Sequence, residues 1–301
     1  MSGATAPATS PARTTAPPSP IPTVGSGRRV GRHVGTTLTW VWIVFSAFPF
    51  VFMVTSAFKT RTDATSIPPR WVFQPTLESF SQAWNGTQGS PEFRQLILNS
   101  TILTASVTVL TLAVGVLAAY ALTLRHFGPR RFLSSWVLST YMFPAVVAIV
   151  PVYYVENRLG LLGTYPGLVV PMVAFNLPIV IWLVRRGIQE VPYEIDEAAR
   201  LDGASTLRIL WSVVLPLLGP VIVTAGILTA ILTWNEFLFA SSLGSGSTQT
   251  APSALLSFTG QYGTQYNILS AASLMVTAPV VVLAFVLRRR LVSGLTLGAV
   301  K

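Results

Sequence analysis

PYEIDEAARLDGASTLRILWSVVLP, residues 192–216, concentrates acidic side chains in a chain that has few of them. The 301 residues include only ten acidic ones. Half of them lie in this stretch or just before it: Glu190, Glu194, Asp196, Glu197 and Asp202. The segment is therefore set apart chemically from the apolar sequence on both sides of it.

Local signals in this stretch predict two helices separated by a bend. Pro192 suits the first turn of a helix, and the acidic residues that follow favour the positive end of the helix dipole. Gly203 is a residue typical of a helix end that needs a positive backbone dihedral. The first helix is therefore predicted over residues 193–202. Ser205 is predicted to cap a second helix that begins near Thr206 and continues into an apolar run.

One face of the first predicted helix carries Ile195, Ala198, Ala199 and Asp202, which follow one another at spacings of three and four. The two alanines make this face thin enough for another protein surface to approach closely. On local chemistry alone, a solvated loop with ordinary helix caps explains the same residues. Both interpretations stay open at this point.

The rest of the chain has the composition of a membrane protein. Hydrophobic residues make up 51% of it and charged residues 10%, with a mean hydropathy of +0.60. A bilayer core of about 30 Å requires about 20 helical residues to cross it. The sequence therefore predicts an all-α membrane protein with six transmembrane helices, at about 37–58, 96–124, 132–155, 165–184, 212–240 and 268–287.

The basic residues predict the orientation of these spans. If the N-terminus is cytoplasmic, fifteen of the twenty Lys and Arg residues fall on the cytoplasmic side. This positive-inside bias predicts that both termini and the loop 185–211 are cytoplasmic. The net charge of +10 then follows from membrane topology, and nucleic acid is not an expected partner.

The chain is predicted to consist of three segments: an N-terminal tail, a membrane domain and a C-terminal tail. Residues 1–33, rich in Ala, Pro, Ser and Thr, are predicted to be a disordered cytoplasmic tail. Residues 34–290 are predicted to form the six-span transmembrane domain, whose first uncharged run is too long for a signal peptide and is predicted to be a retained helix. Residues 291–301 form a cytoplasmic C-terminal tail.

Polar residues outside the acidic stretch supply further candidates. Glu236 lies near the end of the fifth predicted span, where a carboxylate is costly unless it faces a bundle interior, a wet cavity or the interface. With Trp234 and Asn235 it is a candidate for a substrate pathway, and a helix cap at the outer interface is the alternative. Asn176 and Asn99 are weaker candidates of the same kind. The uncharged loop 241–267 either docks on a partner or is a flexible connector.

Several kinds of chemistry are disfavoured by what the sequence lacks. Cysteine is absent, and the only two histidines, His33 and His126, lie beside arginines, so no metal site is expected. The only lysines, Lys59 and Lys301, do not follow a glycine, so no phosphate-binding P-loop is present.

Four motifs give a resemblance to a known family. EAARLDGA, residues 197–204, followed by a Leu-Pro pair, resembles the EAA signature of permease subunits of ABC importers. TWNEFLFA, the segment beginning NSTILTASVTVL, and the end LVSGLTLGAVK resemble the carbohydrate-uptake branch of maltose-type permeases. The resemblance covers about residues 37–301.

This resemblance implies a non-catalytic subunit in the plasma membrane of a prokaryote. It implies that residues 193–202 form a coupling helix that docks on the ATPase. Contact and bend residues would be Glu197, Ala198, Ala199, Asp202, Gly203 and Ala204. ATP and Mg²⁺ would be held by the partner, and this chain would bind no cofactor or metal. The implied partners are a homologous second permease, a dimer of ABC ATPase subunits, an extracytoplasmic sugar-binding protein and membrane lipid.

The implied cargo is a mono- or oligosaccharide. Another solute class, such as a glycerol phosphate or a polyol, is the nearest alternative. An ion-driven carrier or channel would also have six spans but would leave the acidic stretch without a purpose. An intramembrane enzyme is disfavoured because the predicted spans lack a histidine, a cysteine or a pair of acids.

Overall fold

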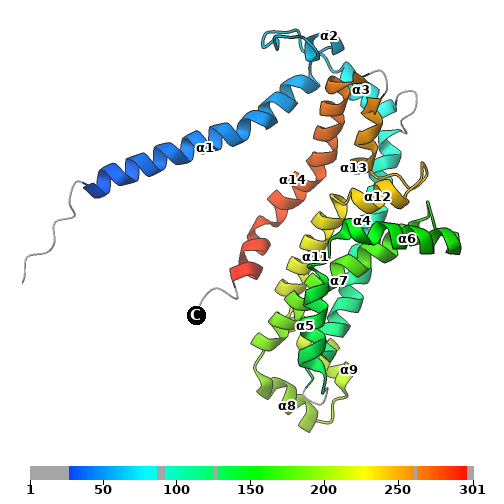
Figure 1. The fold of residues 1–301 in the computed structure, drawn as a ribbon. Coiled ribbons are helices and arrows are strands. Elements are labelled where there is room, and N and C mark those ends of the chain that lie inside the picture. The colour runs from blue at the N-terminus through cyan, green and yellow to red at the C-terminus, as the bar shows by residue number, and fades with distance from the viewer. Residues whose placement is uncertain (1–26, 87–91, 125–127, 261–262, 297–301) are drawn as a thin grey trace, which may run out of the picture. The chain divides into compact units, whose positions relative to one another are not determined.

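The computed structural model describes residues 27–86, 92–124, 128–260 and 263–296 (Figure 1). Nearly all of the described chain is helical, and its only β-structure is one antiparallel pair of two-residue strands. The predicted tail residues 1–26 and 297–301 lie outside the described residues.

The longer helices are α1 (Gly27–Ala57), α4 (Phe93–Ala121), α5 (Arg130–Thr140), α6 (Ala145–Leu159), α7 (Tyr165–Glu190), α8 (Tyr193–Leu201), α11 (Gly219–Trp234) and α14 (Tyr266–Thr296). Shorter elements connect them: α2 (Arg61–Ala64), α3 (Glu78–Asn85), α9 (Thr206–Ile209), the π-helix η1 (Leu210–Val214), α10 (Leu215–Leu217), α12 (Leu238–Leu243), α13 (Ala251–Ala254), the 3-10 helix η2 (Leu255–Phe258), β1 (Thr259–Gly260) and β2 (Gly263–Thr264).

Four of the described helices are long and apolar enough to cross a membrane: His33–Ala57, Phe93–Ala121, Tyr165–Glu190 and Tyr266–Phe285. Two bent helix pairs meet the same test when each pair is taken as one span, which brings the number to six. The all-helical class with several apolar helices is therefore confirmed.

The two bent pairs coincide with the predicted spans 132–155 and 212–240, neither of which is a single helix. α5 and α6 meet at 93°, and Thr206–Leu217 meets α11 at 81°. Proline occupies both breaks, because Pro144 is the N-cap of α6 and Pro220 lies in the first turn of α11. Proline lacks the backbone N–H that would continue a preceding helix, and it is tolerated in the first turn of the next one.

Helix boundaries also differ from the predicted ones at the two ends. α1 begins at Gly27, so residues 27–33 of the predicted disordered tail are helical. α14 continues to Thr296, so residues 291–296 of the predicted C-terminal tail are helical as well. Arg288, Arg289 and Arg290, followed by Leu291, are good helix formers, so the sequence gives the helix no reason to stop at residue 290.

The core described here lies within residues 51–301, which form a unit separate from residues 1–50. In this unit α4 packs along α7 and α11, and α11 packs on α14 (Figure 1). Gly115 of α4 allows a close approach to α7. A Cβ at this position would lie 2.7 Å from Cγ1 of Val180, whose side chain is fully buried. Small residues permit such contacts between membrane helices, where packing drives association.

Replacing Gly115 by leucine is expected to separate α4 from α7. Overpacking of this kind costs about 1–3 kcal/mol, and the measurement is thermal unfolding of the chain in detergent. The matched control is Gly35→Leu, because Gly35 is also inside a helix but nothing lies within 4 Å of its virtual Cβ. Equal loss of stability in the two variants would contradict the packing role of Gly115.

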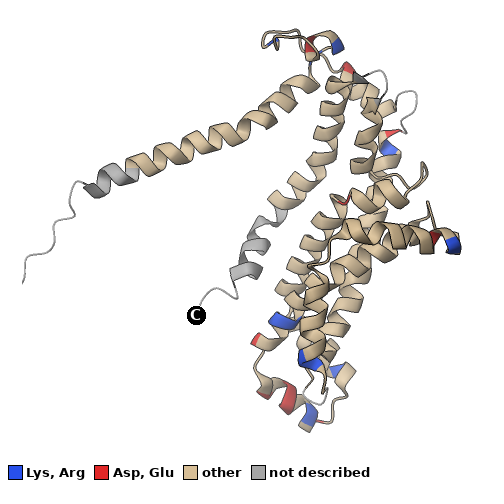
Figure 2. Cartoon of the chain, in the orientation of Figure 1, with Lys and Arg blue, Asp and Glu red and all other residues tan. Residues whose placement is uncertain are grey.

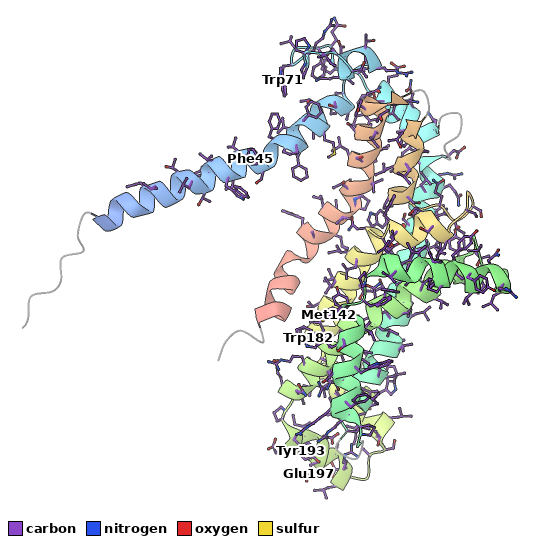
Figure 3. The ribbon with its side chains drawn as sticks, in the orientation of Figure 1. Phe45, Trp71, Met142, Trp182, Tyr193 and Glu197 are labelled. Atoms are coloured by element: carbon purple, nitrogen blue, oxygen red, sulfur yellow. The ribbon has the colours of Figure 1, made fainter. Side chains whose placement is uncertain are left out.

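At the end of α1, Lys59 is buried among aromatic rings. Its side chain is 2% exposed, and its Nζ lies 5.8, 5.7 and 5.1 Å from the ring centroids of Phe52, Trp71 and Phe73. Trp71 is labelled in Figure 3. Cation–π attraction and the hydrogen bond that the Lys59 carbonyl accepts from Ser79 connect α1, the loop that follows it and α3.

Candidate functional site

The acidic stretch folds into a helix, a bend and a second helix. α8 ends at Leu201, and Asp202 is its C-cap. Gly203 has a φ of +80°, which lies in the left-handed region that favours glycine. The Ser205 hydroxyl accepts a hydrogen bond of 3.4 Å from the backbone N–H of Arg208 at the start of α9. These features confirm the predicted helices, bend and cap.

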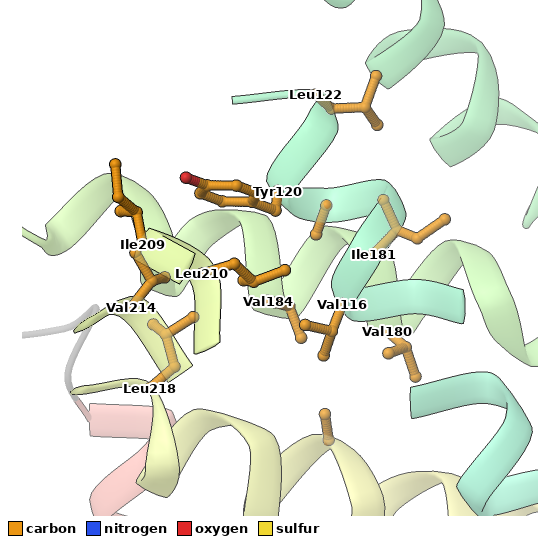
Figure 4. Packing of buried hydrophobic residues seen from close by; sticks show 12 residues of the cluster. Val116, Tyr120, Leu122, Val180, Ile181, Val184, Ile209, Leu210, Val214 and Leu218 are labelled. Carbon is orange, nitrogen blue, oxygen red and sulfur yellow. The ribbon is translucent and has the colours of Figure 1, made fainter. Parts of the chain in front are cut away.

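The second helix, formed by α9, η1 and α10 (residues 206–217) and called the stem below, is anchored in the core. Ile209 and Leu210 are fully buried, and Val214 and Leu218 are nearly so. They pack with side chains of α4 and α7 in one hydrophobic cluster (Figure 4). Movement of α8 would therefore be passed to the bundle through this stem, because a closely packed core transmits displacement rather than absorbing it.

One ion pair stiffens α8. The Arg200 Nε donates to a carboxylate oxygen of Asp196 at 2.9 Å, with the two residues four positions apart. This hydrogen bond raises the pKa of the Arg200 guanidinium above its ordinary value. In Figure 2 the charged residues of α8 lie at the same end of the bundle as the basic residues that end α7 and begin α5.

The structure divides the six predicted coupling residues into two groups. Glu197, Ala198, Asp202 and Gly203 are exposed. Ala199 and Ala204 are partly buried and pack against the hydrophobic cluster of the stem. A backbone hydrogen bond of 3.0 Å from Ala204 N to the Ala199 carbonyl closes the bend between them. The outward group is free to meet another molecule, whereas the inward alanines fit α8 to the bundle.

Sequence reasoning missed the most exposed apolar side chain of this site. Leu201 is 85% exposed, and Leu207 on the next helix is 62% exposed. The signal was available, because Leu201 interrupts a run of polar and small residues just before Asp202 and Gly203. Figure 3 labels Glu197 and Tyr193 at the same end of the bundle.

The predicted sugar-pathway residues are each bonded to backbone groups. The Glu236 carboxylate accepts from the backbone N–H groups of Phe239 and Ala240 at 2.9 and 3.1 Å, which is the geometry of a cap on α12. Trp234 Nε1 donates to the Val276 carbonyl of α14 at 3.1 Å.

The two asparagine side chains of this group bond within their own helices. Asn235 donates to Ile231 O, and Asn176, which is 8% exposed, donates to Met172 O, each at 2.8 Å. Among the described residues no hydrogen bond joins Asn176 to Trp234, Asn235 or Glu236. A role of the four residues in a sugar pathway stays a prediction.

Asn99 of α4 makes a different set of contacts. It is fully buried, and its Nδ2 donates to the carbonyls of Ser247 and Gln249 at 3.0 and 2.8 Å. Its Oδ1 accepts from Gln95 Nε2 and from the Tyr165 hydroxyl, both at 2.8 Å. Asn99 therefore uses both amide atoms to attach the loop after α12 to α4 and α7.

The loop after α12 makes further hydrogen bonds besides those with Asn99. Thr250 and Ser253 form a capping box at the start of α13. The backbone N–H of Ala251 donates to the Ser100 hydroxyl at 2.9 Å. The exposed positions Ser245 and Ser247 lie at the tip of this hydrogen-bonded loop. These contacts attach residues 247–251 to α4, and docking of the loop on a partner stays a prediction.

The comparisons with known proteins agree on one kind of protein. The model of the family "Binding-protein-dependent transport system inner membrane component" matches residues 111–296. The chain is 39% identical over 276 residues to a probable ABC transporter permease protein of Sinorhizobium fredii, with 91% of this chain and 97% of that protein covered. It is 32% identical over 252 residues to a trehalose transport system permease protein of Mycobacterium tuberculosis, with 78% and 92% covered.

A solved structure has the same fold. It is a crystal structure of a bacterial ABC transporter involved in the import of the acidic polysaccharide alginate. The TM-score is 0.73 and the identity 21%, and the match covers 89% of this chain and 99% of the other.

Proposed function

Because the chain belongs to the family of binding-protein-dependent transport system inner membrane components, we propose that its acidic stretch couples ATP hydrolysis in a partner to movement of its spans. The chain is a multi-pass membrane permease subunit of a sugar importer of the ABC type, and the ATPase is a separate subunit. The coupling role of residues 192–216 is the part proposed here.

The observation that carries this proposal is the exposed face of α8. Glu197, Ala198, Leu201 and Asp202 are exposed at one end of the bundle, while the stem below them is buried. Leu201 places an exposed apolar side chain among these polar groups, and protein interfaces combine apolar contacts with a polar rim in this way. The buried stem would carry the motion of that contact into α11.

The wider assembly follows from the same proposal. Six spans, with each bent pair crossing once and both termini in the cytoplasm, would place α8 on the side of the ATPase. The partners would be a homologous second permease, a dimer of ATPase subunits that hold ATP and Mg²⁺, and an extracytoplasmic binding protein that delivers the sugar. The ordered loop after α12 would face that binding protein. No cofactor or metal is assigned to this chain.

A cysteine placed at Leu201 is expected to crosslink to the ATPase subunit. The chain has no cysteine of its own, so the label is unique. The control is Leu159→Cys at the end of α6, which is 65% exposed and would lie on the opposite side of the membrane. Both variants are assembled with their partner subunits and treated with a thiol-to-amine crosslinker, and the products are identified by mass spectrometry.

A product between residue 201 and the ATPase, together with none from residue 159, supports the proposal. If residue 201 in an assembled, ATP-hydrolysing transporter gives no ATPase product, α8 does not dock there. A product from both positions would contradict the orientation.

A further inference from the structure

A pocket of about 400 Å³ lies between the inward side of α8 and the adjoining ends of α4, α5 and α7. Its volume falls within the range of small-ligand sites, about 300–1,000 Å³. The described residues that line it include four arginines, Arg130, Arg131, Arg185 and Arg200, and a single acidic residue, Asp196. The pocket is distinct from the outward coupling face, which consists of Glu197, Ala198, Leu201 and Asp202.

The positive charge of this pocket is only partly balanced. Asp196 is paired with Arg200, and Arg130 donates a hydrogen bond of 3.3 Å to the Leu124 carbonyl. Arg131 and Arg185 have no ion pair with any described residue, and Arg185 Nε is buried without a hydrogen bond to one. A guanidinium that is partly desolvated without a counterion is unfavourable. An anion in the pocket would relieve this cost.

A tyrosine adds a second, independent observation. The side chain of Tyr120 is 6% exposed, and its ring belongs to the hydrophobic cluster that contains Leu210 (Figure 4). Its hydroxyl is buried at the pocket beside the Asp196 carboxylate, which is the one acceptor near it within the described chain. Asp196 is already paired with Arg200, so a ligand oxygen in the pocket would give this buried hydroxyl an acceptor that is not shared.

We propose that this pocket binds a phosphate group. Guanidinium groups hold phosphate oxygens through paired, charge-assisted hydrogen bonds, and several arginines around one cavity match the several oxygens of such a group. Arg131 and Arg185 would provide the main contacts, with the Tyr120 hydroxyl as an additional donor. The phosphate belongs either to the headgroup of an anionic phospholipid or to a free phosphate compound.

The position of the pocket indicates what binding would do. Its walls come from α8 on one side and from the ends of three bundle helices on the other. A phosphate that contacts both sides would hold α8 in its place and so favour the arrangement in which its outward face is presented. The cytoplasmic location of the site rests on the orientation in the proposed function. Basic pockets between membrane helices on that side bind lipid headgroups in general.

The test is titration calorimetry on the full chain, purified in a neutral detergent. The two probes are inorganic phosphate and dihexanoyl phosphatidylglycerol, a soluble short-chain anionic lipid. The variants are Arg131→Gln, which changes an exposed side chain, and Arg185→Gln. The control is Arg186→Gln, which removes the same charge from the next residue of α7, an exposed side chain that does not line the pocket. Elution volume and circular dichroism check that each variant is folded.

Saturable binding is expected in the wild-type chain, and each pocket variant should weaken it about tenfold, as loss of a hydrogen bond to a charged group does. The Arg186→Gln control should stay within about twofold, because an isolated exposed charge contributes little. If both probes bind, a free phosphate compound is sufficient to occupy the pocket. If only the lipid binds, the ligand is the phosphate of a lipid headgroup.

Two outcomes would overturn the proposal: neither probe saturates the chain, or all three variants lose the same affinity, which indicates general surface attraction. The titration involves no transport and no ATP. A negative result therefore removes the phosphate site only, whereas a missing crosslink at residue 201 removes the coupling role only.

Discussion

Replacing Asn99 by leucine is expected to detach the loop after α12 and to stop binding-protein-dependent uptake. Leucine has a similar volume but removes the four hydrogen bonds that Asn99 makes, with Gln95, Tyr165 and the carbonyls of Ser247 and Gln249. Each such hydrogen bond contributes about 0.5–1.5 kcal/mol, so we expect the free energy of unfolding to fall by about 2–5 kcal/mol.

Loop mobility is measured by spin-label spectroscopy on a single cysteine introduced at Ser245. Asn99→Leu should release the label, whereas Asn85→Leu should not, because among the described residues the exposed Asn85 bonds to Ser81 of its own helix α3. If the label at residue 245 stays as immobile in Asn99→Leu as in the parent chain, Asn99 does not hold the loop.

Replacing Gly203 by valine is expected to reduce uptake by more than about tenfold while the chain still inserts into the membrane. The φ of +80° at Gly203 is strained for any residue with a Cβ and most for a β-branched one, at about 1–3 kcal/mol. The cost is relieved by changing the bend, which tilts α8 away from the position set by Ala199 and Ala204. Uptake and ATPase stimulation are the measurements.

Gly203→Asn is the control that isolates this cause. No atom lies within 4 Å of a Cβ built at Gly203, so the size of the side chain is not the obstacle. Asparagine tolerates positive φ far better than valine does, so it should retain most of the uptake. Equal loss in both variants would show that the position requires the absence of a side chain, which points to contact with the partner rather than to the backbone bend.

The local structure of the acidic stretch was predictable because its signals lie close together in sequence. A proline at the start, a glycine at the end and a serine two positions later specify helix, bend and cap through interactions within a few residues. The apolar runs were predictable for the same reason, since the length needed to cross a membrane can be counted directly.

The bends in the third and fifth predicted spans were not predictable from the presence of proline alone. Pro144 and Pro220 lie at breaks, yet Pro151, Pro171 and Pro178 lie inside helices. Whether a proline bends or breaks a helix depends on how neighbouring groups satisfy the freed carbonyls, and this is a property of the packed bundle.

Roles of single polar side chains required the structure as well. From sequence, Asn99 and Glu236 were both candidates for a sugar pathway. In the structure Asn99 holds a loop some 150 residues further along the chain, and Glu236 caps the start of α12. An amide or carboxylate in an apolar run must be paired, but the sequence does not say with which atom.

The sequence by itself determined the membrane class, the family, and the helix, bend and cap of residues 192–216, because each depends on composition or on contacts between near neighbours. The tertiary structure decided which side of α8 faces outward, where Leu201 is presented, which partner Asn99 binds, and that four arginines from three helices line one pocket. These depend on residues brought together from distant parts of the chain by packing, and no local pattern encodes such contacts.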